Sequence, residues 1–174
     1  EWLELKSSPL AFEGTCCEAL GRTKYRTRDM IAIIPGAKHK ENILSLLQLP
    51  PGTKAASVPS KPLDLSPEGI MPLSDSQASI YRAATGSAIY LSLDDRVIQY
   101  AIKELARRMA SPRVCDMQAL KLLGRFLLNG ERGRVVVITP DVREAYQAGQ
   151  PLPMRGYSDF DWAGCPETRR STGS

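Results

Sequence analysis

The spacing of apolar residues predicts three helices in the middle of the chain. From Ser74 to Leu91, Asp95 to Met109 and Val114 to Leu128, apolar side chains recur every three to four residues with polar residues between them. This is the period at which one face of a helix repeats. The connections between the segments are short, and short connections favour antiparallel neighbours. The pattern therefore predicts a helical bundle.

Residues at the helix ends and one internal glycine refine this prediction. Ser74 or Asp75 can cap the first helix, and Asp94 or Asp95 the second, because short polar side chains accept hydrogen bonds from the N–H groups of a first turn. Gly86 interrupts the first helix. A glycine is permissible at this position where another backbone packs closely.

A hairpin, a helix and a linker are predicted before the bundle. Residues 1–18 show no periodicity and predict a loosely ordered end, whereas Tyr25 and the apolar run Ile31–Ile34 predict a hairpin. Lys38 to Leu49 has helical spacing. Residues 50–74 contain six prolines among serine, lysine and glycine, which is typical of an extended linker where parts of a protein meet.

Two further strands are predicted after the bundle. The valine-rich run from Arg134 to Thr139 predicts a largely buried strand, and residues 146–153 predict a loop or short helix. Residues 157–162 have the aromatic content of a strand. Alternate residues of a strand point to one face, so Asp159 and Asp161 should project together.

Two carboxylates on one face repel each other unless a cation or a basic group lies between them. Asp159 and Asp161 are therefore a candidate site for a divalent metal ion and for the phosphodiester chemistry that such an ion supports. A pair of solvated carboxylates on an edge strand would show the same pattern. The residues alone leave both interpretations open.

Positive charge concentrates in the helical part. The chain has 174 residues and a net charge of +4, but the segment from Asp95 to Arg134 holds nine Lys and Arg residues against four Asp and Glu residues. Such an excess can bind a polyanion. Solvated helix faces with a surplus of arginine would give the same count, and this alternative also stays open.

The remaining composition excludes several kinds of site. The four cysteines lack Cys-x-x-Cys spacing and His39 is the only histidine, so neither a zinc site nor a disulfide framework is indicated, and a reducing compartment is expected. No apolar run has the roughly 20 residues that a membrane helix needs. The chain begins without Met and without the features of a secretory signal, and we expect it to be part of a longer protein.

A family pattern is present at the C-terminal end. Its residues are Tyr157, Ser158, Asp159, Asp161, Ala163, Gly164, Thr168, Arg169, Arg170, Ser171, Thr172 and Gly173. This run resembles the start of the ribonuclease H domain in the Pol polyprotein of copia-type long-terminal-repeat retrotransposons. Ile80–Leu91 is similar to a second motif of that family, Tyr-Arg-x-x-(Val/Thr)-Gly-x-(Leu/Ala)-(Met/Leu)-Tyr-Leu. The resemblance extends from about Leu20 to the end of the chain.

The sequence departs from this family at three places. Asp94-Asp95-Arg96 follows the second motif where Arg-Pro-Asp is usual, His39 stands in place of Tyr, and Ala55 in place of Pro. These changes suggest a diverged or decaying copy. The run containing Asp94 and Asp95 is also similar to the Tyr-x-Asp-Asp of a polymerase site, but it lies between helical segments, so we predict a helix cap.

The resemblance implies an α+β fold in four parts. Residues 1–19 would be a loosely ordered end, and residues 20–73 the hairpin, helix and Pro-rich linker that follow the polymerase palm. Residues 74–130 would belong to the helical thumb and connection, a bundle of three to four helices. Residues 131–174 would hold the first strands of a truncated ribonuclease H-like domain.

The resemblance also implies reverse transcriptase and ribonuclease H activities for the parent protein. Asp159 would be the first metal ligand of a two-ion site for Mg²⁺ or Mn²⁺, and Asp161 a ligand or a supporting neighbour. We expect the palm and most ribonuclease H acids to lie outside this chain and the chain to be inactive alone.

Nucleic acid is the partner that the resemblance implies. Template–primer duplex or RNA–DNA hybrid would be gripped through phosphates by basic side chains, namely Arg107, Arg108, Lys121, Arg125, Arg169 and Arg170. The rest of the Pol polyprotein would be a second partner, with no role for a membrane. The family location would be the cytoplasm, in virus-like particles, and the nucleus. Two alternatives are a non-catalytic helical interaction module and a decayed pseudogene product that folds poorly.

Overall fold

The structure is a computed structural model that describes residues 13–130, 132–153, 156, 160–161 and 172–173. It divides into two compact units, one ending at Val136 and the other beginning at Val137. The described elements are both helices and strands, so the fold is mixed α+β.

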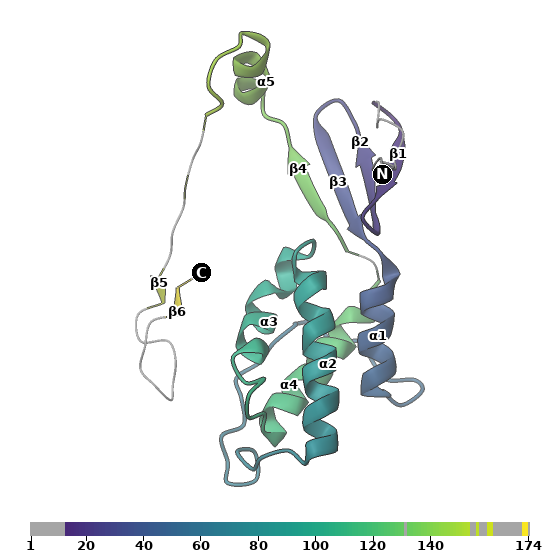
Figure 1. Ribbon diagram of the computed structural model, residues 1–174, viewed down its shortest axis with the longest axis vertical. Coiled ribbons are helices and arrows are strands. Elements are labelled where there is room, and N and C mark those ends of the chain that lie inside the picture. Colours follow the sequence, from purple (N-terminus) through teal and green to yellow (C-terminus); the bar gives the residue numbers. More distant parts are fainter. Residues whose placement is uncertain (1–12, 131, 154–155, 157–159, 162–171, 174) are drawn as a thin grey trace, which may run out of the picture. The chain divides into compact units, whose positions relative to one another are not determined.

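A four-stranded sheet forms one end of the first unit (Figure 1). Its strands lie in the order β1 (Cys16–Ala19), β2 (Arg22–Arg26), β3 (Met30–Pro35) and β4 (Arg134–Val137). The first three pair antiparallel. The predicted hairpin is β2–β3 and is confirmed. The turn between β1 and β2 has positive φ at Leu20 and Gly21, as two-residue hairpin turns require.

Two expectations about the sheet were wrong. Residues 16–19 form β1 and are not a loosely ordered end; their backbone pairs with β2 although the four residues lack an apolar pattern. The valine run of β4 is not buried, since Val135 is 55% exposed and Val137 is 64% exposed. Because β4 is the last strand in the sheet order, its apolar composition does not ensure cover on both faces.

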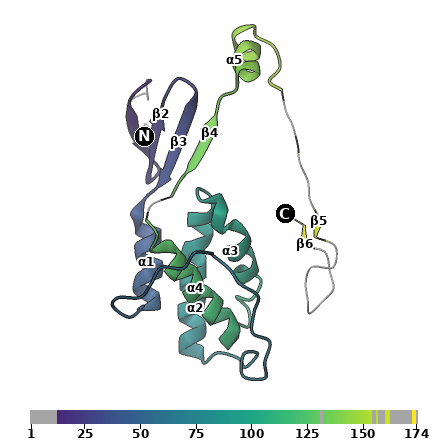
Figure 2. The ribbon, with the colours of Figure 1, turned by 180° about the vertical axis from the view of Figure 1, so that it is seen from behind.

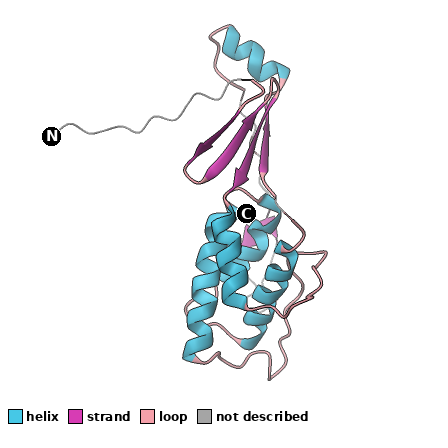
Figure 3. Ribbon diagram, turned by 90° about the vertical axis from the view of Figure 1, so that its right-hand side faces the viewer, coloured by secondary structure: helices cyan, strands magenta, loops and turns pink. Residues whose placement is uncertain are grey.

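The helices form the rest of this unit, and Figure 3 shows the sheet at one end of them. They are α1 (Ala37–Leu47), α2 (Asp75–Ser92), α3 (Gln99–Ala106) and α4 (Val114–Leu127), with a 3₁₀ turn η1 (Arg96–Ile98) before α3. The predicted helices are confirmed, although α3 ends earlier than expected. Their buried faces make one core, whose fully buried large residues include Ile43, Tyr81, Ile98, Leu120 and Leu123.

The proline-rich linker runs along α4 rather than away from the bundle (Figure 2). Near the end of the helix, the Ala56 N–H donates to the Arg125 carbonyl at 3.1 Å. Near its start, the Cys115 N–H donates to the Gly69 carbonyl at 2.9 Å. The residues before and after the linker therefore share a single core, in which α1 packs against both α2 and α4.

The glycine at which two helices approach closely is Gly124 and not Gly86. A Cβ built on Gly86 meets no atom within 4 Å, whereas one on Gly124 of α4 would lie 2.5 Å from Cδ1 of Leu47 in α1. Gly124 is thus the residue that lets two helices approach closely. The sequence position of a glycine does not reveal which helix face will carry a neighbour.

Replacing Gly86 with alanine should raise the free energy of unfolding by about 1 kcal/mol, because alanine favours the helix and the space around Gly86 is open. Urea denaturation measures the change. Gly124→Ala is the matched control: it gains the same helix propensity, but its Cβ displaces Leu47, so no net gain is expected. Equal stabilisation by both changes would contradict this assignment.

The second unit contains α5 (Pro140–Gln147) and a short ladder of β5 (Phe160–Asp161) with β6 (Thr172–Gly173). Pro140 stands at the first position of α5, where proline is favoured, so this helix begins before the predicted segment 146–153. β5 and β6 pair antiparallel with Asp161 opposite Thr172. The prediction that Asp161 lies in a strand is confirmed.

Candidate functional site

Two buried carboxylates join the sheet to the helices at the end of α2. Asp94 and Asp95 are each only 3% exposed. Asp94 forms an ion pair with Nε of Arg22 in β2. Asp95 accepts from the Val97 N–H at 3.1 Å, which confirms its predicted capping role, and its other oxygen lies 3.6 Å from Nε of Arg132. The pair is therefore a structural junction, and the likeness to a polymerase motif has no catalytic counterpart here.

Burial raises the pKa of Asp95 above its usual range, against the opposing effects of the Val97 N–H and Arg132. Between the unfolded and folded pKa values the folded state holds more protons, so the contribution of this carboxyl to stability falls as pH rises. Asp95→Asn keeps a capping oxygen and should remove that fall. Free energies of unfolding measured across this pH range test the prediction, with Asp75→Asn as a control at an exposed position. If Asp95→Asn showed the same fall in stability with pH as the unmodified chain, Asp95 would not be the carboxyl responsible.

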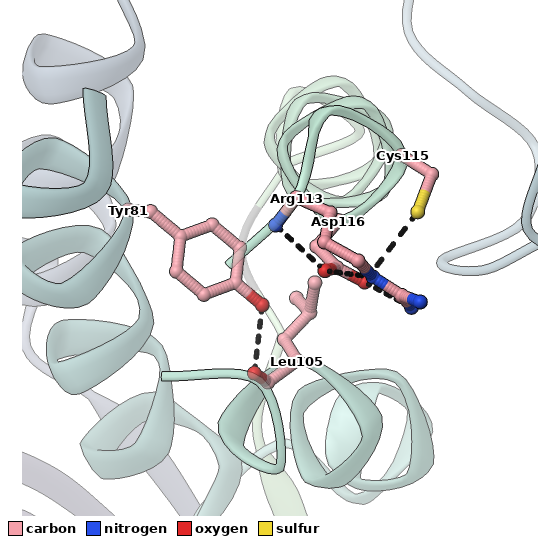
Figure 4. A network of polar contacts seen from close by, with 5 residues as sticks. All are labelled: Tyr81, Leu105, Arg113, Cys115 and Asp116. Atoms are coloured by element: carbon pink, nitrogen blue, oxygen red, sulfur yellow. Dashed lines mark hydrogen bonds and ion pairs between the residues drawn. The ribbon is translucent and has the colours of Figure 1, made fainter. Parts of the chain in front are cut away.

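A second polar network lies between α2, α3 and α4 (Figure 4). The Tyr81 hydroxyl donates to the Leu105 carbonyl at 2.7 Å, and Asp116 accepts from the backbone and side chain of Arg113. Burial is the main cause that raises the pKa of Tyr81 and also that of the Cys115 thiol. Both groups therefore stay protonated near neutral pH, and Cys115 is a packed thiol rather than a nucleophile.

The structure separates the predicted nucleic-acid contacts into two sets. At the end of α3, Arg107 pairs with Glu104 at 3.0 Å and Arg108 is partly buried. On α4, Lys121 is exposed and lies one turn before Arg125, whose Nε donates to the Lys54 carbonyl at 2.9 Å. Among the described residues, no carboxylate lies within ion-pair distance of Lys121 or Arg125. The α4 set thus keeps its charge uncompensated.

Lys54 joins this face and was missed by the sequence analysis. It is exposed, and its carbonyl holds the guanidinium of Arg125. Its place beside α4 depends on the path of the linker, which no local sequence signal specifies. We call Lys54, Lys121 and Arg125 the α4 basic strip.

The geometry of the remaining predicted site residues is not described by the structure. Asp159, Arg169 and Arg170 lie outside the described residues, and Asp161 is described only as part of β5. Within the described ranges, no three His, Cys, Asp or Glu side chains gather as a metal site would require. The same ranges contain no helix with both the length and the apolar character to cross a membrane. The metal site at Asp159 and Asp161 stays a prediction.

Curated relatives of the chain come from Arabidopsis thaliana. The retrovirus-related Pol polyprotein from transposon RE1 is 34% identical over 92 residues, and that from transposon RE2 is 33% identical over 92 residues. The chain is a homologue of retrotransposon Pol polyproteins. The chain is also 32% identical over 94 residues to an uncharacterized mitochondrial protein of the same plant. The predicted resemblance to retrotransposon Pol polyproteins is therefore confirmed, whereas the copia-type assignment stays a prediction.

The aligned regions are partial on both sides. The alignment with the RE1 polyprotein covers 53% of the chain and 6% of that polyprotein. The alignment with the mitochondrial protein covers 54% of the chain and 35% of that protein. The chain thus spans a small share of these relatives. No family model and no solved structure matches it.

Proposed function

We propose that the chain is the segment of a copia-type Pol polyprotein in which the last helices of reverse transcriptase lead into the ribonuclease H domain. In that role it binds template–primer duplex or RNA–DNA hybrid through phosphates. The observation that carries this proposal is the α4 basic strip, in which Lys121 and Arg125 lie one helical turn apart and Arg125 is hydrogen-bonded to the backbone of the exposed Lys54. Phosphate contact of this kind gives affinity without sequence preference.

Arg107 and Arg108 have a lesser part in this proposal. Arg107 already has a carboxylate partner in Glu104, and an ion pair with Glu104 offsets the attraction of Arg107 for phosphate. Lys121 and Arg125 are one helical turn apart on α4, so they can contact neighbouring phosphates. The strip therefore carries most of the proposed affinity.

Removing the two charges with Lys121→Ala and Arg125→Ala together should weaken binding of an RNA–DNA hybrid equally for all sequences. The slope of log affinity against log salt should become shallower by about 2, which corresponds to two lost phosphate contacts. Fluorescence anisotropy over a salt series measures this slope. Lys38→Ala, which removes an exposed charge from the first turn of α1, is the matched control. An unchanged slope in the double variant would count against the proposal.

The ribonuclease H part of the proposal rests on Asp159 and on Asp161 in β5. Two-ion nuclease sites need carboxylates from several structural elements, whereas Asp159 and Asp161 are only two positions apart in the sequence. Bound Mg²⁺ or Mn²⁺ would supply an activated water and stabilise the leaving oxygen in the complete site. We therefore propose that the chain contributes the first metal ligand and binds metal weakly by itself.

A hybrid-cleavage assay in Mg²⁺ tests this limit. The chain alone should leave the RNA strand intact, because Asp159 and Asp161 do not by themselves provide the several carboxylates that a two-ion site needs. Cleavage by the chain that is abolished in Asp159→Asn would show that the site is complete in this chain. Isothermal titration with Mn²⁺ should give weak binding that Asp159→Asn reduces further.

A second candidate is a helical interaction module. The corner between α2 and α3 exposes Tyr90, Leu93, Val97 and Tyr100, each more than half accessible. Exposed apolar groups on neighbouring turns are typical of protein contacts. If this candidate is correct, Val97→Asp should abolish binding to the rest of the Pol polyprotein while affinity for the hybrid stays unchanged.

A further inference from the structure

An open depression of about 340 Å³ lies where α1 ends and the linker begins. Its volume is at the lower end of the range of small-ligand sites. The walls combine apolar side chains with a few polar ones and are formed by Leu44, Ser45, Gln48, Leu49, Pro50, Gly52, Thr53 and Leu128. This mixture suits a flat organic group that has both an apolar face and polar edges.

The backbone around this depression is fixed by local contacts. Gln48 ends α1 in the left-handed conformation with φ of 44°, and Gly52 has φ of 75°. The backbone N–H and the hydroxyl of Thr53 both donate to the Pro50 carbonyl. The wall is thus formed in the free protein, so a ligand does not have to order it.

The α4 basic strip borders the depression. Lys54 directly follows Thr53 in the wall, and its carbonyl holds Nε of Arg125. Leu128, another wall residue, follows Arg125 by about one turn of helix. A guanidinium has five N–H donors, and the Lys54 contact uses one of them, so Arg125 is oriented but can still bind an anion.

We propose that the depression binds an unpaired nucleotide of the nucleic acid whose phosphates contact the α4 basic strip. This inference rests on the proposed function and adds to it a preference for nucleic acid with an unpaired nucleotide. The base would contact the apolar walls, with its edges near Ser45 and Gln48, while Lys54 and Arg125 bind the adjoining phosphates. Bases inside a duplex are stacked and paired and cannot enter. A hybrid with a single-stranded extension should therefore bind more tightly than a blunt one.

Anisotropy measurements on the full chain compare a blunt RNA–DNA hybrid with the same hybrid carrying a short single-stranded extension. We expect about tenfold tighter binding of the extended hybrid, which is the lower part of the range for a base stacked on an aromatic side chain, because the walls here are aliphatic and polar. Ser45→Trp, which fills the depression from an exposed position of α1, should remove this preference without weakening blunt-hybrid binding. Ser79→Trp, at an exposed position of α2, is the matched control and should retain the preference for the extended hybrid.

The outcomes separate the two proposals. Equal affinity of the unmodified chain for both hybrids, with steep salt dependence, would overturn the nucleotide site and leave the proposed function standing. Failure to bind either hybrid at low salt would overturn both. If Ser45→Trp lowers the melting temperature, Leu128→Ala provides the test, since it removes an apolar wall that is 39% exposed; an unchanged preference in that variant would also overturn the site.

Discussion

Replacing Asp116 with alanine should lower the free energy of unfolding by about 3 kcal/mol, because it removes a buried acceptor and leaves its donors without a partner. The Asp116 side chain is 2% exposed. Its Oδ2 accepts from the Arg113 backbone N–H at 2.9 Å and from Arg113 Nε at 3.1 Å. The same carboxylate lies in the first turn of α4, where a negative charge is favoured.

Urea denaturation of Asp116→Ala and Asp116→Asn separates the parts of this effect. Asparagine keeps an oxygen for the Arg113 N–H but lacks the charge that pairs with the guanidinium, so its loss should be intermediate. Glu68→Ala, in the exposed linker, is a control for removing an acid and should change little. A loss below about 1 kcal/mol in Asp116→Ala would mean that Arg113 finds another partner or water.

Asp94→Ala should lower the free energy of unfolding by about 2 kcal/mol. Asp94 is buried and pairs with Arg22, whose side chain is 29% exposed, so part of the cost of an unpaired guanidinium is relieved by solvent. The pair links β2 to the end of α2, and its loss should also loosen the hairpin. Amide hydrogen exchange should therefore accelerate in β2 and β3 more than in α4.

A double-mutant cycle checks that Arg22 is the partner responsible. Arg22→Met retains most of the aliphatic stem and removes the charge. If the pair is coupled, the double variant should lose less stability than the sum of the two single changes. Strict additivity would contradict the junction between β2 and α2.

The sequence predicted the elements whose signals are local. α2 and α4 follow from apolar residues at helical spacing, and β2–β3 from Tyr25 and the apolar run Ile31–Ile34 on either side of a turn. β1 and the exposure of β4 could not be predicted, because pairing and cover depend on which distant segments meet. Gly86 and Gly124 illustrate the same limit, since both are helix-interior glycines and only one meets a neighbouring helix.

The candidate nucleic-acid surface could be predicted in part. The charge count indicated the segment that contains Lys121 and Arg125, and the three-residue spacing of Glu104 and Arg107 was a local sign of an ion pair that the count did not use. Lys54 could not be found in this way, because 71 positions separate it from Arg125, to which it is hydrogen-bonded. Prediction of this surface was therefore limited by the missing tertiary contacts and not by the chemistry of its residues.

The most direct test of the proposed nucleic-acid role is to map backbone amide chemical shifts of the chain during titration with an RNA–DNA hybrid. The largest changes should fall on α4 from Lys121 onward and on the linker around Lys54, and they should fade as salt is raised. Changes confined to α5 or to the corner of α2 and α3, or no changes at low salt, would contradict binding through the α4 basic strip.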